Sequence, residues 1–234
     1  MNVEDLITKV RKPPSLQNWV RLNHRRRDDT VRSITAFVLG RPRHALVKIY
    51  GLVADYVTFG VSKSDILKGL QNVTNPLVRK LGREILGVLL PWLDNAEIKG
   101  IQVFHEFSVP FPIGRGILVP VKPTFVFQFE GKLVPVFVIG WASMPFTEFQ
   151  KRLLGTIIRQ AILTLEGFED SDAHIVCVPR LKGSHSERWV RPWKVSDLPP
   201  LSEEELREQF DRFGNALDDA VPVILEELAR RGEL

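Results

Sequence analysis

Residues 133–139 read LVPVFVI and are apolar at every position. A strand with one face in water alternates apolar and polar side chains, whereas a strand covered on both faces needs no polar positions. We therefore expect this segment to be a central strand of a sheet that helices cover on both sides. The preceding TFVFQF predicts a neighbouring strand, and Glu130, Gly131 and Lys132 form the hairpin turn between the two, where glycine supplies the backbone freedom that a tight turn needs.

Helical spacing of apolar residues dominates the chain before these strands. We expect helices in LQNWVRLNHRRRDDTVRSITAFVLG, in RPRHALVKIYGLVADYVTFG, in SKSDILKGL after a cap at Ser62 or Ser64, and from residue 75 or 76 to 90. Pro91 is expected near the end of the last of these helices, because proline lacks the N–H that a helix interior uses.

From Ile98 the period changes to that of a strand, and after Pro145 we predict a helix, a buried strand in AHIVCVPR and a C-terminal helix. Ser202 and Glu205 have the spacing of a capping box at the start of that helix, and Gly214 is a candidate break within it. The order of elements predicts an α/β fold with a central mixed sheet flanked by helices. Its parts are a helical N-terminal region (1–72), an α/β core (73–195) and a C-terminal helical extension (196–234).

Opposite charges concentrate at the two ends of the chain. The first 60 residues hold 11 Lys or Arg against 5 Asp or Glu, and residues 201–234 hold 4 against 10. This asymmetry predicts that the acidic tail packs against the N-terminal region or a neighbouring subunit, and that the basic part is available to an anionic partner.

Composition narrows the class of protein. With 44% hydrophobic residues, 234 residues are enough to bury one sizeable core. No apolar run reaches the roughly 18 residues that span a bilayer, and Glu4 and Asp5 near the start do not fit a secretory signal. We therefore expect a cytoplasmic protein without a membrane partner. The single cysteine, Cys177, lies in an apolar run and is expected to be a buried, inert thiol.

The order helix, strand, hairpin, buried strand, helix and strand in residues 76–179 resembles the core of the PD-(D/E)XK nuclease superfamily, the restriction-endonuclease-like fold. In that family, a proline and an acid open the second strand, and an acid-x-lysine triplet ends the third. The resemblance implies that the acids hold a divalent metal that activates water, and that the lysine stabilises the developing charge.

The chain departs from this family at each chemically active position. VKPTFVFQFEGKLVPVFVIGW keeps Pro123, but Thr124 stands where the aspartate would be, and the triplet falls on Phe137, Val138 and Ile139. Phenylalanine and isoleucine cannot ligate Mg²⁺, which requires oxygen donors. The resemblance therefore implies a relative without the ordinary metal-dependent cleavage, and we expect no metal or cofactor.

Other acids do not restore the motif. Glu97, Ile98 and Lys99 spell an acid-x-lysine triplet after a predicted helix end, and a second such triplet is the hairpin turn, so both are expected in solvent. His105 and Glu106 point to opposite faces of their predicted strand and cannot share one site.

Glu84 is the one further candidate for a metal-binding acid. Some family members place such an acid on the helix before the strands. With Arg83 beside it and Lys80 four residues earlier, Glu84 is more typical of a surface ion pair. The alternative is a nuclease with a rearranged Mg²⁺ site in which Glu84 or Glu106 takes part.

The segment PRLKGSHSERWVRPWK interleaves cations with tryptophans, which suits the phosphates and unpaired bases of nucleic acid. The candidate binding residues are Arg180, Lys182, Arg188, Trp189, Arg191, Trp193 and Lys194. The alternative is structural: the tryptophans pin the loop onto the core while the arginines extend outward.

Two weaker binding signals lie near the N-terminus. HRRRDDTVR places three arginines before two aspartates, which partly neutralise them, so a solvated helix end is favoured. The helices ending in SDILKGLQN also imitate a helix-turn-helix, although only Lys68, Gln71 and Asn72 suit base edges.

These observations favour a catalytically inactive nuclease relative that binds DNA or RNA, or that serves as a structural subunit of a homodimer or of a complex with an active partner. A third hypothesis is a protein-interaction module. It would use the apolar stripe of the C-terminal helix formed by Leu206, Phe210, Phe213, Leu217, Val221 and Leu225, unless that stripe packs on the chain's own core.

Overall fold

The computed structural model describes residues 8, 10–40, 46–98, 108–143 and 146–233. The described helices are α2 (Leu16–Leu22), α3 (Arg27–Leu39), α4 (Val47–Phe59), α5 (Lys63–Gln71), α6 (Pro76–Asn95), α7 (Glu148–Ala161) and α8 (Glu203–Arg230), with a short 3₁₀ helix η2 (Val195–Asp197). The strands are β1 (Val109–Pro112), β2 (Leu118–Val121), β3 (Phe125–Phe129), β4 (Lys132–Ile139), β5 (His174–Cys177) and β6 (Arg191–Lys194).

The main sheet has the strand order β3-β4-β5-β6 and is mixed. β4 pairs antiparallel with β3 and parallel with β5, and β5 pairs antiparallel with β6. β1 and β2 form a separate antiparallel pair. The mixed α/β class is therefore as expected. Most of the strand predicted from Ile98 lies outside the described residues, and its described end pairs with β2, a strand that the sequence analysis did not identify.

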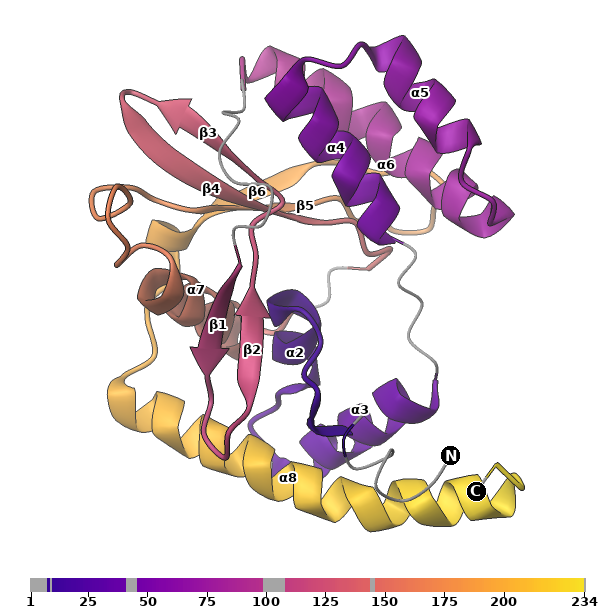
Figure 1. Ribbon diagram of the computed structural model, residues 1–234, viewed down its shortest axis with the longest axis vertical. Coiled ribbons are helices and arrows are strands. Elements are labelled where there is room, and N and C mark those ends of the chain that lie inside the picture. The colour runs from indigo at the N-terminus through magenta and orange to yellow at the C-terminus, as the bar shows by residue number, and fades with distance from the viewer. Residues whose placement is uncertain (1–7, 9, 41–45, 99–107, 144–145, 234) are drawn as a thin grey trace.

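The main sheet is covered on both faces (Figure 1). Alternate β4 residues enter two different clusters of buried side chains: Phe137 and Ile139 join the one with α2, α3, α7 and α8, whereas Val136 and Val138 join the one with α4, α5 and α6. Because both faces are packed, β4 is apolar throughout, and the prediction of a covered central strand is confirmed.

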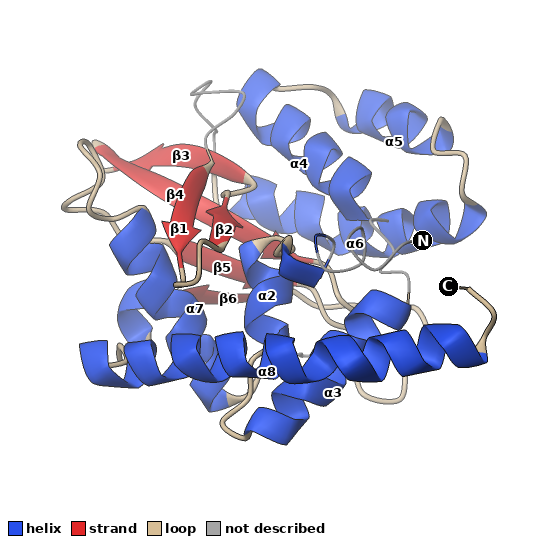
Figure 2. Cartoon of the chain, turned by 60° about the horizontal axis from the view of Figure 1, so that its bottom comes forward, coloured by secondary structure: helices blue, strands red, loops and turns tan. Residues whose placement is uncertain are grey.

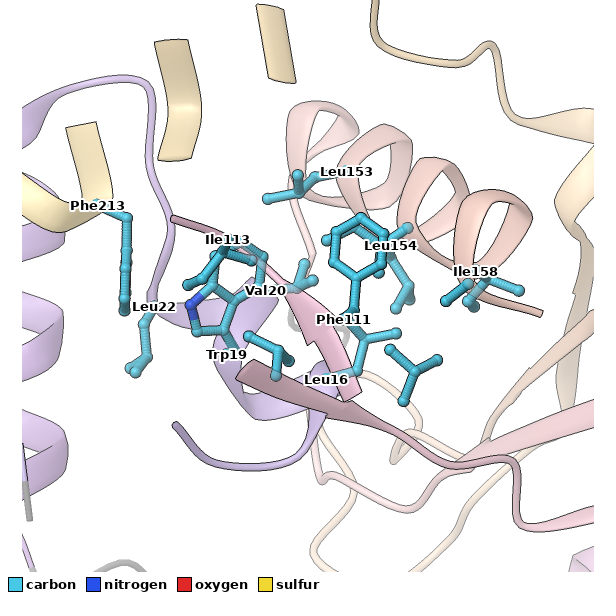
Figure 3. Packing of buried hydrophobic residues seen from close by; sticks show 14 of the residues in the cluster. Leu16, Trp19, Val20, Leu22, Phe111, Ile113, Leu153, Leu154, Ile158 and Phe213 are labelled. Atoms are coloured by element: carbon cyan, nitrogen blue, oxygen red, sulfur yellow. The ribbon is translucent and has the colours of Figure 1, made fainter. Parts of the chain in front are cut away.

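Trp19 lies at the centre of the first cluster (Figure 3). Its ring is fully buried and meets the Phe213 ring of α8 edge-on at 5.2 Å, with Phe210 at 6.2 Å. The β1–β2 hairpin contributes Phe111 and Ile113 to the same cluster. α2, α8 and this hairpin therefore share one core.

The oppositely charged ends of the chain lie together, because α8 runs along α3 (Figure 2). Arg27 on α3 pairs with Asp219 on α8 at 2.6 Å. The expected break at Gly214 is wrong, since α8 is continuous. Gly214 instead gives room to the Arg115 side chain, whose guanidinium bonds Asp218 and Asn215.

Local signals at helix ends were mostly accurate. Ser62 caps α5, and Ser202 caps α8 within a capping box. Glu130 and Gly131 both have positive φ and form the hairpin turn. Pro91 lies near the end of α6, as expected, but the helix continues to Asn95 and does not stop at residue 90. The segment predicted as the first helix, LQNWVRLNHRRRDDTVRSITAFVLG, forms two separate helices, α2 and α3.

Among the described helices, no stretch is both long and apolar enough to cross a bilayer.

Candidate nucleic-acid interface

Thr124, Phe137 and Ile139, the positions that the sequence resemblance aligns with metal-binding residues, belong to the sheet and its core. Phe137 and Ile139 are buried against the α7 side of the sheet. The Thr124 hydroxyl accepts the N–H of Val138 at 3.0 Å, and the Thr124 N–H donates to Val136 at 2.7 Å. Thr124 thus extends the β3–β4 ladder, and its one oxygen already has a donor.

Glu84 does not lie on the surface beside Lys80 and Arg83, so that prediction is wrong. Its side chain is 6% exposed and accepts from Arg180 at 2.9 and 3.0 Å and from Arg188 at 3.1 Å. Both guanidinium groups donate hydrogen bonds to the Glu84 carboxylate, because a buried charge requires partners of opposite charge. Glu84 holds the 180–188 loop onto α6.

Arg188 also departs from its predicted place in a surface binding loop. Its side chain is fully buried, and Nη1 donates to the carbonyl oxygens of Val178, Gly140 and Trp141 at 2.6, 3.1 and 3.3 Å. Burial lowers the pKa of Arg188, against the opposing effect of Glu84. Arg188 therefore joins the ends of β4 and β5. Its Nη2 is buried and has no hydrogen-bond partner among the described residues.

Tyr50 of α4 completes this junction. Its hydroxyl accepts the N–H of Gly140 at 3.0 Å. Burial raises the pKa of Tyr50 to about 12, although the Gly140 bond opposes the shift. The hydroxyl therefore keeps its proton at neutral pH and remains a hydrogen-bond donor.

Trp189 lies outside, next in sequence to the buried arginine. It is 43% exposed, so the pinning interpretation is wrong for this ring. The Arg191 guanidinium lies 5.6 Å from the Trp189 ring and 5.7 Å from the Trp193 ring, and Lys151 of α7 lies 5.0 Å from Trp193. Trp193 is partly buried against the core. The result is an alternating arrangement of cations and rings at the β6 edge of the sheet.

Two further pairs of this kind adjoin the start of α7, and the sequence analysis missed them. Arg21 lies 5.3 Å from the Trp141 ring, and Arg25 lies 5.6 Å from the Phe149 ring. Gln150 in the first turn of α7 brings them there by donating to the backbone oxygens of Arg21 and Asn23 at 3.1 and 2.8 Å. The pairs join residues more than a hundred positions apart, so no local pattern predicts them.

We refer to these residues together as the aromatic–cation cluster: Arg21, Arg25, Trp141, Phe149, Lys151, Trp189, Arg191 and Trp193. Within the described residues, Arg21, Arg25 and Arg191 form no ion pair, while Lys151 pairs with Glu148. Lys182 and Lys194 lie exposed nearby in the chain. Cations beside accessible rings can contact phosphates and stack on bases.

The remaining sequence candidates lie elsewhere. Glu97 follows the end of α6, as expected, whereas Lys99, His105 and Glu106 lie outside the described residues. Cys177 is buried, and burial raises its pKa to about 12, which fits the predicted inert thiol.

Three of the four arginines in HRRRDDTVR form ion pairs within the described residues, and Arg27 does so with Asp219 of α8. Asp29 contacts Arg26 and Arg32. In the imitated recognition helix, Lys68 pairs with Asp65 at 2.9 Å.

A cleft of about 1320 Å³ opens where β3 and β4 meet the helices. Its wall includes Thr124, Gly140 and Arg188, together with Arg21 and Trp141 of the aromatic–cation cluster. The charged residues that line it are Arg21, Lys122, Arg188 and Asp55. Across the described ranges, no three His, Cys, Asp or Glu side chains cluster as a metal site.

Comparison with known proteins adds no family to these observations: no protein-family model and no curated protein sequence matches the chain.

Proposed function

We propose that this protein binds single-stranded nucleic acid without cleaving it, through the aromatic–cation cluster. The observation that carries the proposal is the position of Arg191 between Trp189 and Trp193, with Trp189 43% exposed. An exposed ring offers its face to any unpaired base, at about 1–3 kcal/mol per stacked base. The adjacent guanidinium groups supply contacts to phosphates.

The same proposal treats the chain as an inactive relative of PD-(D/E)XK nucleases. Support comes from the mixed sheet between two helical layers, with β4 and β5 parallel on either side of α7 in sequence. Further support comes from Phe137 and Ile139, whose side chains are packed as core. The restriction-endonuclease-like fold and the loss of cleavage are part of the proposal.

A rearranged nuclease site remains the competing proposal, and Glu84 would be its acid. Both carboxylate oxygens of Glu84 accept from Arg180, so metal binding there requires the arginines to leave. Incubation of the unmodified protein with labelled single- and double-stranded DNA and RNA in Mg²⁺ or Mn²⁺ separates the two proposals. We expect intact strands, and reproducible cleavage that copurifies with the protein contradicts an inactive relative.

Binding is tested by fluorescence anisotropy with labelled single-stranded oligonucleotides at two or more salt concentrations. Trp189→Ala is expected to weaken binding by about 5-fold or more, because a stacked base is lost. Arg191→Ala is expected to weaken binding and to reduce the dependence of affinity on salt, since fewer counterions are released.

Lys68→Ala is the matched control, because it removes an exposed positive charge on α5, which packs on the opposite face of the sheet. Its affinity should stay near that of the unmodified protein. Equal losses in all three variants indicate attraction by net charge alone and count against the cluster. Failure of the unmodified protein to bind any single strand refutes the proposed function.

A further inference from the structure

We propose that the cleft beside the aromatic–cation cluster receives the phosphorylated end of the bound strand. The inference rests on the proposed function and deepens it, since it assigns strand ends bearing a terminal phosphate as the preferred ligand. Arg21 and Trp141 connect the two regions, because both belong to the cluster and both line the cleft. A strand that stacks on the cluster can therefore place its last nucleotide in the cleft.

The charges of the cleft favour an anion. Among the described residues, Arg21 and Lys122 line it against the single acid Asp55, and Arg188 adds a side chain that is itself fully buried in the wall. Behind the wall, Arg188 shares the Glu84 carboxylate with Arg180, so two positive groups face one negative group. Charge buried in this way is weakly screened and acts over the adjoining cavity. A terminal phosphate carries more negative charge than a phosphate within the strand, and it therefore gains most from this field.

Two hydrogen-bond donors at the junction of β4 and α4 lack acceptors. Arg188 Nη2 is buried without a partner in the described structure. The Tyr50 hydroxyl accepts from Gly140, while its own proton has no described acceptor. Buried polar groups are rarely left unpaired, so Arg188 Nη2 calls for a further ligand, and the half-buried Tyr50 hydroxyl can donate to the same ligand. Phosphate oxygens are suitable acceptors, because hydrogen bonds between charged groups are short and strong. The side chains over Nη2 must move aside when the phosphate enters.

The walls of the cleft suit the base and sugar of the terminal nucleotide. Aromatic side chains that line it include Phe37 of α3, Tyr50 of α4 and Phe125 of β3. Val47 and Leu77 also line it and are 65% and 43% exposed. The terminal base would cover this apolar surface.

The test compares three internally labelled oligonucleotides of one sequence, bearing a 5′-phosphate, a 3′-phosphate or hydroxyl groups at both ends. We expect one of the phosphorylated strands to bind about tenfold tighter than the hydroxyl-ended strand, as hydrogen bonds to a charged group predict. Lys122→Ala and Tyr50→Phe should move the ratio of the two affinities towards one. Lys68→Ala, on α5, should keep the ratio of the unmodified protein.

The outcomes separate this inference from the proposed function. If the hydroxyl-ended strand binds as tightly as both phosphorylated strands, end recognition is wrong and single-strand binding stands. If no strand binds, the proposed function fails and the inference falls with it. If a free nucleoside 5′-monophosphate binds while the hydroxyl-ended strand does not, the cleft takes a free nucleotide and the strand-end assignment is overturned.

Discussion

At the scale of single residues, one carboxylate decides how a loop of the protein is held. The Glu84 side chain is almost fully buried, and its partners Arg180 and Arg188 reach it from the loop between β5 and β6. Removal of one member of a buried ion pair leaves an uncompensated charge, which costs far more than the loss of an exposed pair.

Glu84→Gln is therefore expected to lower the free energy of unfolding by about 3 kcal/mol or more, because Arg188 keeps its buried charge without a counter-charge. Glu148→Gln is the matched control: it breaks the pair between the exposed Glu148 carboxylate and Lys151 and should cost less than about 1 kcal/mol. Urea denaturation followed by circular dichroism measures both. Equal losses in the two variants contradict the assigned role of Glu84.

The buried phenol of Tyr50 predicts a dependence of stability on alkaline pH. Burial raises the pKa of Tyr50 from its ordinary value near 10 to about 12. Below pH 10 both the folded and the unfolded chain hold the phenolic proton, and the associated stability is fully present. Between pH 10 and 12 the unfolded chain releases the proton while the folded chain retains it. Stability is therefore lost in this window, at up to about 1.4 kcal/mol per pH unit.

Tyr50→Phe isolates this effect, because phenylalanine cannot ionise. The free energy of unfolding of the unmodified protein, minus that of the variant, should decrease by up to about 2–3 kcal/mol from pH 10 to 12. Parallel urea titrations at several pH values measure the difference. A constant difference over this range would show that the hydroxyl is not buried in the folded state.

At the scale of elements, α6 shows how one helix uses glycine in two ways. Gly82 faces α4 and α5, where an added methyl group would lie 2.5 Å from Leu70 Cδ1 and 2.6 Å from Ile49 Cδ1. Gly87 on the same helix is exposed, and no atom lies within 4 Å of the corresponding position. The first glycine permits close helix packing, whereas the second only lowers helix propensity.

Alanine substitutions in α6 should therefore have opposite signs. Gly87→Ala is expected to raise the free energy of unfolding by up to about 1 kcal/mol through helix propensity. Gly82→Ala is expected to lower it by about 1–3 kcal/mol, because the methyl group overpacks the contact with Ile49 and Leu70. Thermal and urea denaturation measure both. If Gly82→Ala stabilises the protein as much as Gly87→Ala, α6 does not pack closely against α4 and α5 at Gly82.

At the scale of the whole molecule, α8 is part of the core. The apolar stripe considered as a partner surface is occupied by the chain itself: Leu206, Phe213 and Leu217 are buried in the cluster with α2 and α7. Phe213 also packs edge-on against Trp19 near the N-terminus. We therefore expect α8 to unfold together with the sheet.

Phe213→Ala should lower the free energy of unfolding by about 3–5 kcal/mol and shift the whole transition, because it leaves a cavity beside Trp19. Val223→Ala, at a 45% exposed position of the same helix, should change stability by no more than about 0.5 kcal/mol. Far-ultraviolet circular dichroism and tryptophan fluorescence should report one coincident transition for each variant. Two separate transitions contradict a shared core.

Features that depend on residues close together in the sequence were predicted, whereas features that depend on distant residues were not. Periodicity and turn chemistry predicted the covered strand β4, the EGK turn and the caps at Ser62 and Ser202, because each depends on neighbours within a few residues. The break expected at Gly214 is absent, and α6 continues past the end predicted at residue 90 with Pro91 inside it. Packing of α6 and α8 on the core outweighs the low helix propensity of proline and glycine. Helix propensity alone does not include this packing energy.

The candidate site followed the same division. The sequence by itself determined that Thr124, Phe137 and Ile139, which the proposed resemblance aligns with the active positions of the nuclease superfamily, cannot supply two acids and a lysine wherever they lie. Only the tertiary structure decided that Arg188 turns inward to Glu84 while its neighbour Trp189 turns outward. The physical reason is that the partners of the buried Arg188 charge come from α6 and from two strand ends, and the α6 partner, Glu84, is about a hundred residues away. The sequence shows that Glu84, Arg180 and Arg188 are charged, but only the fold brings the three side chains into contact.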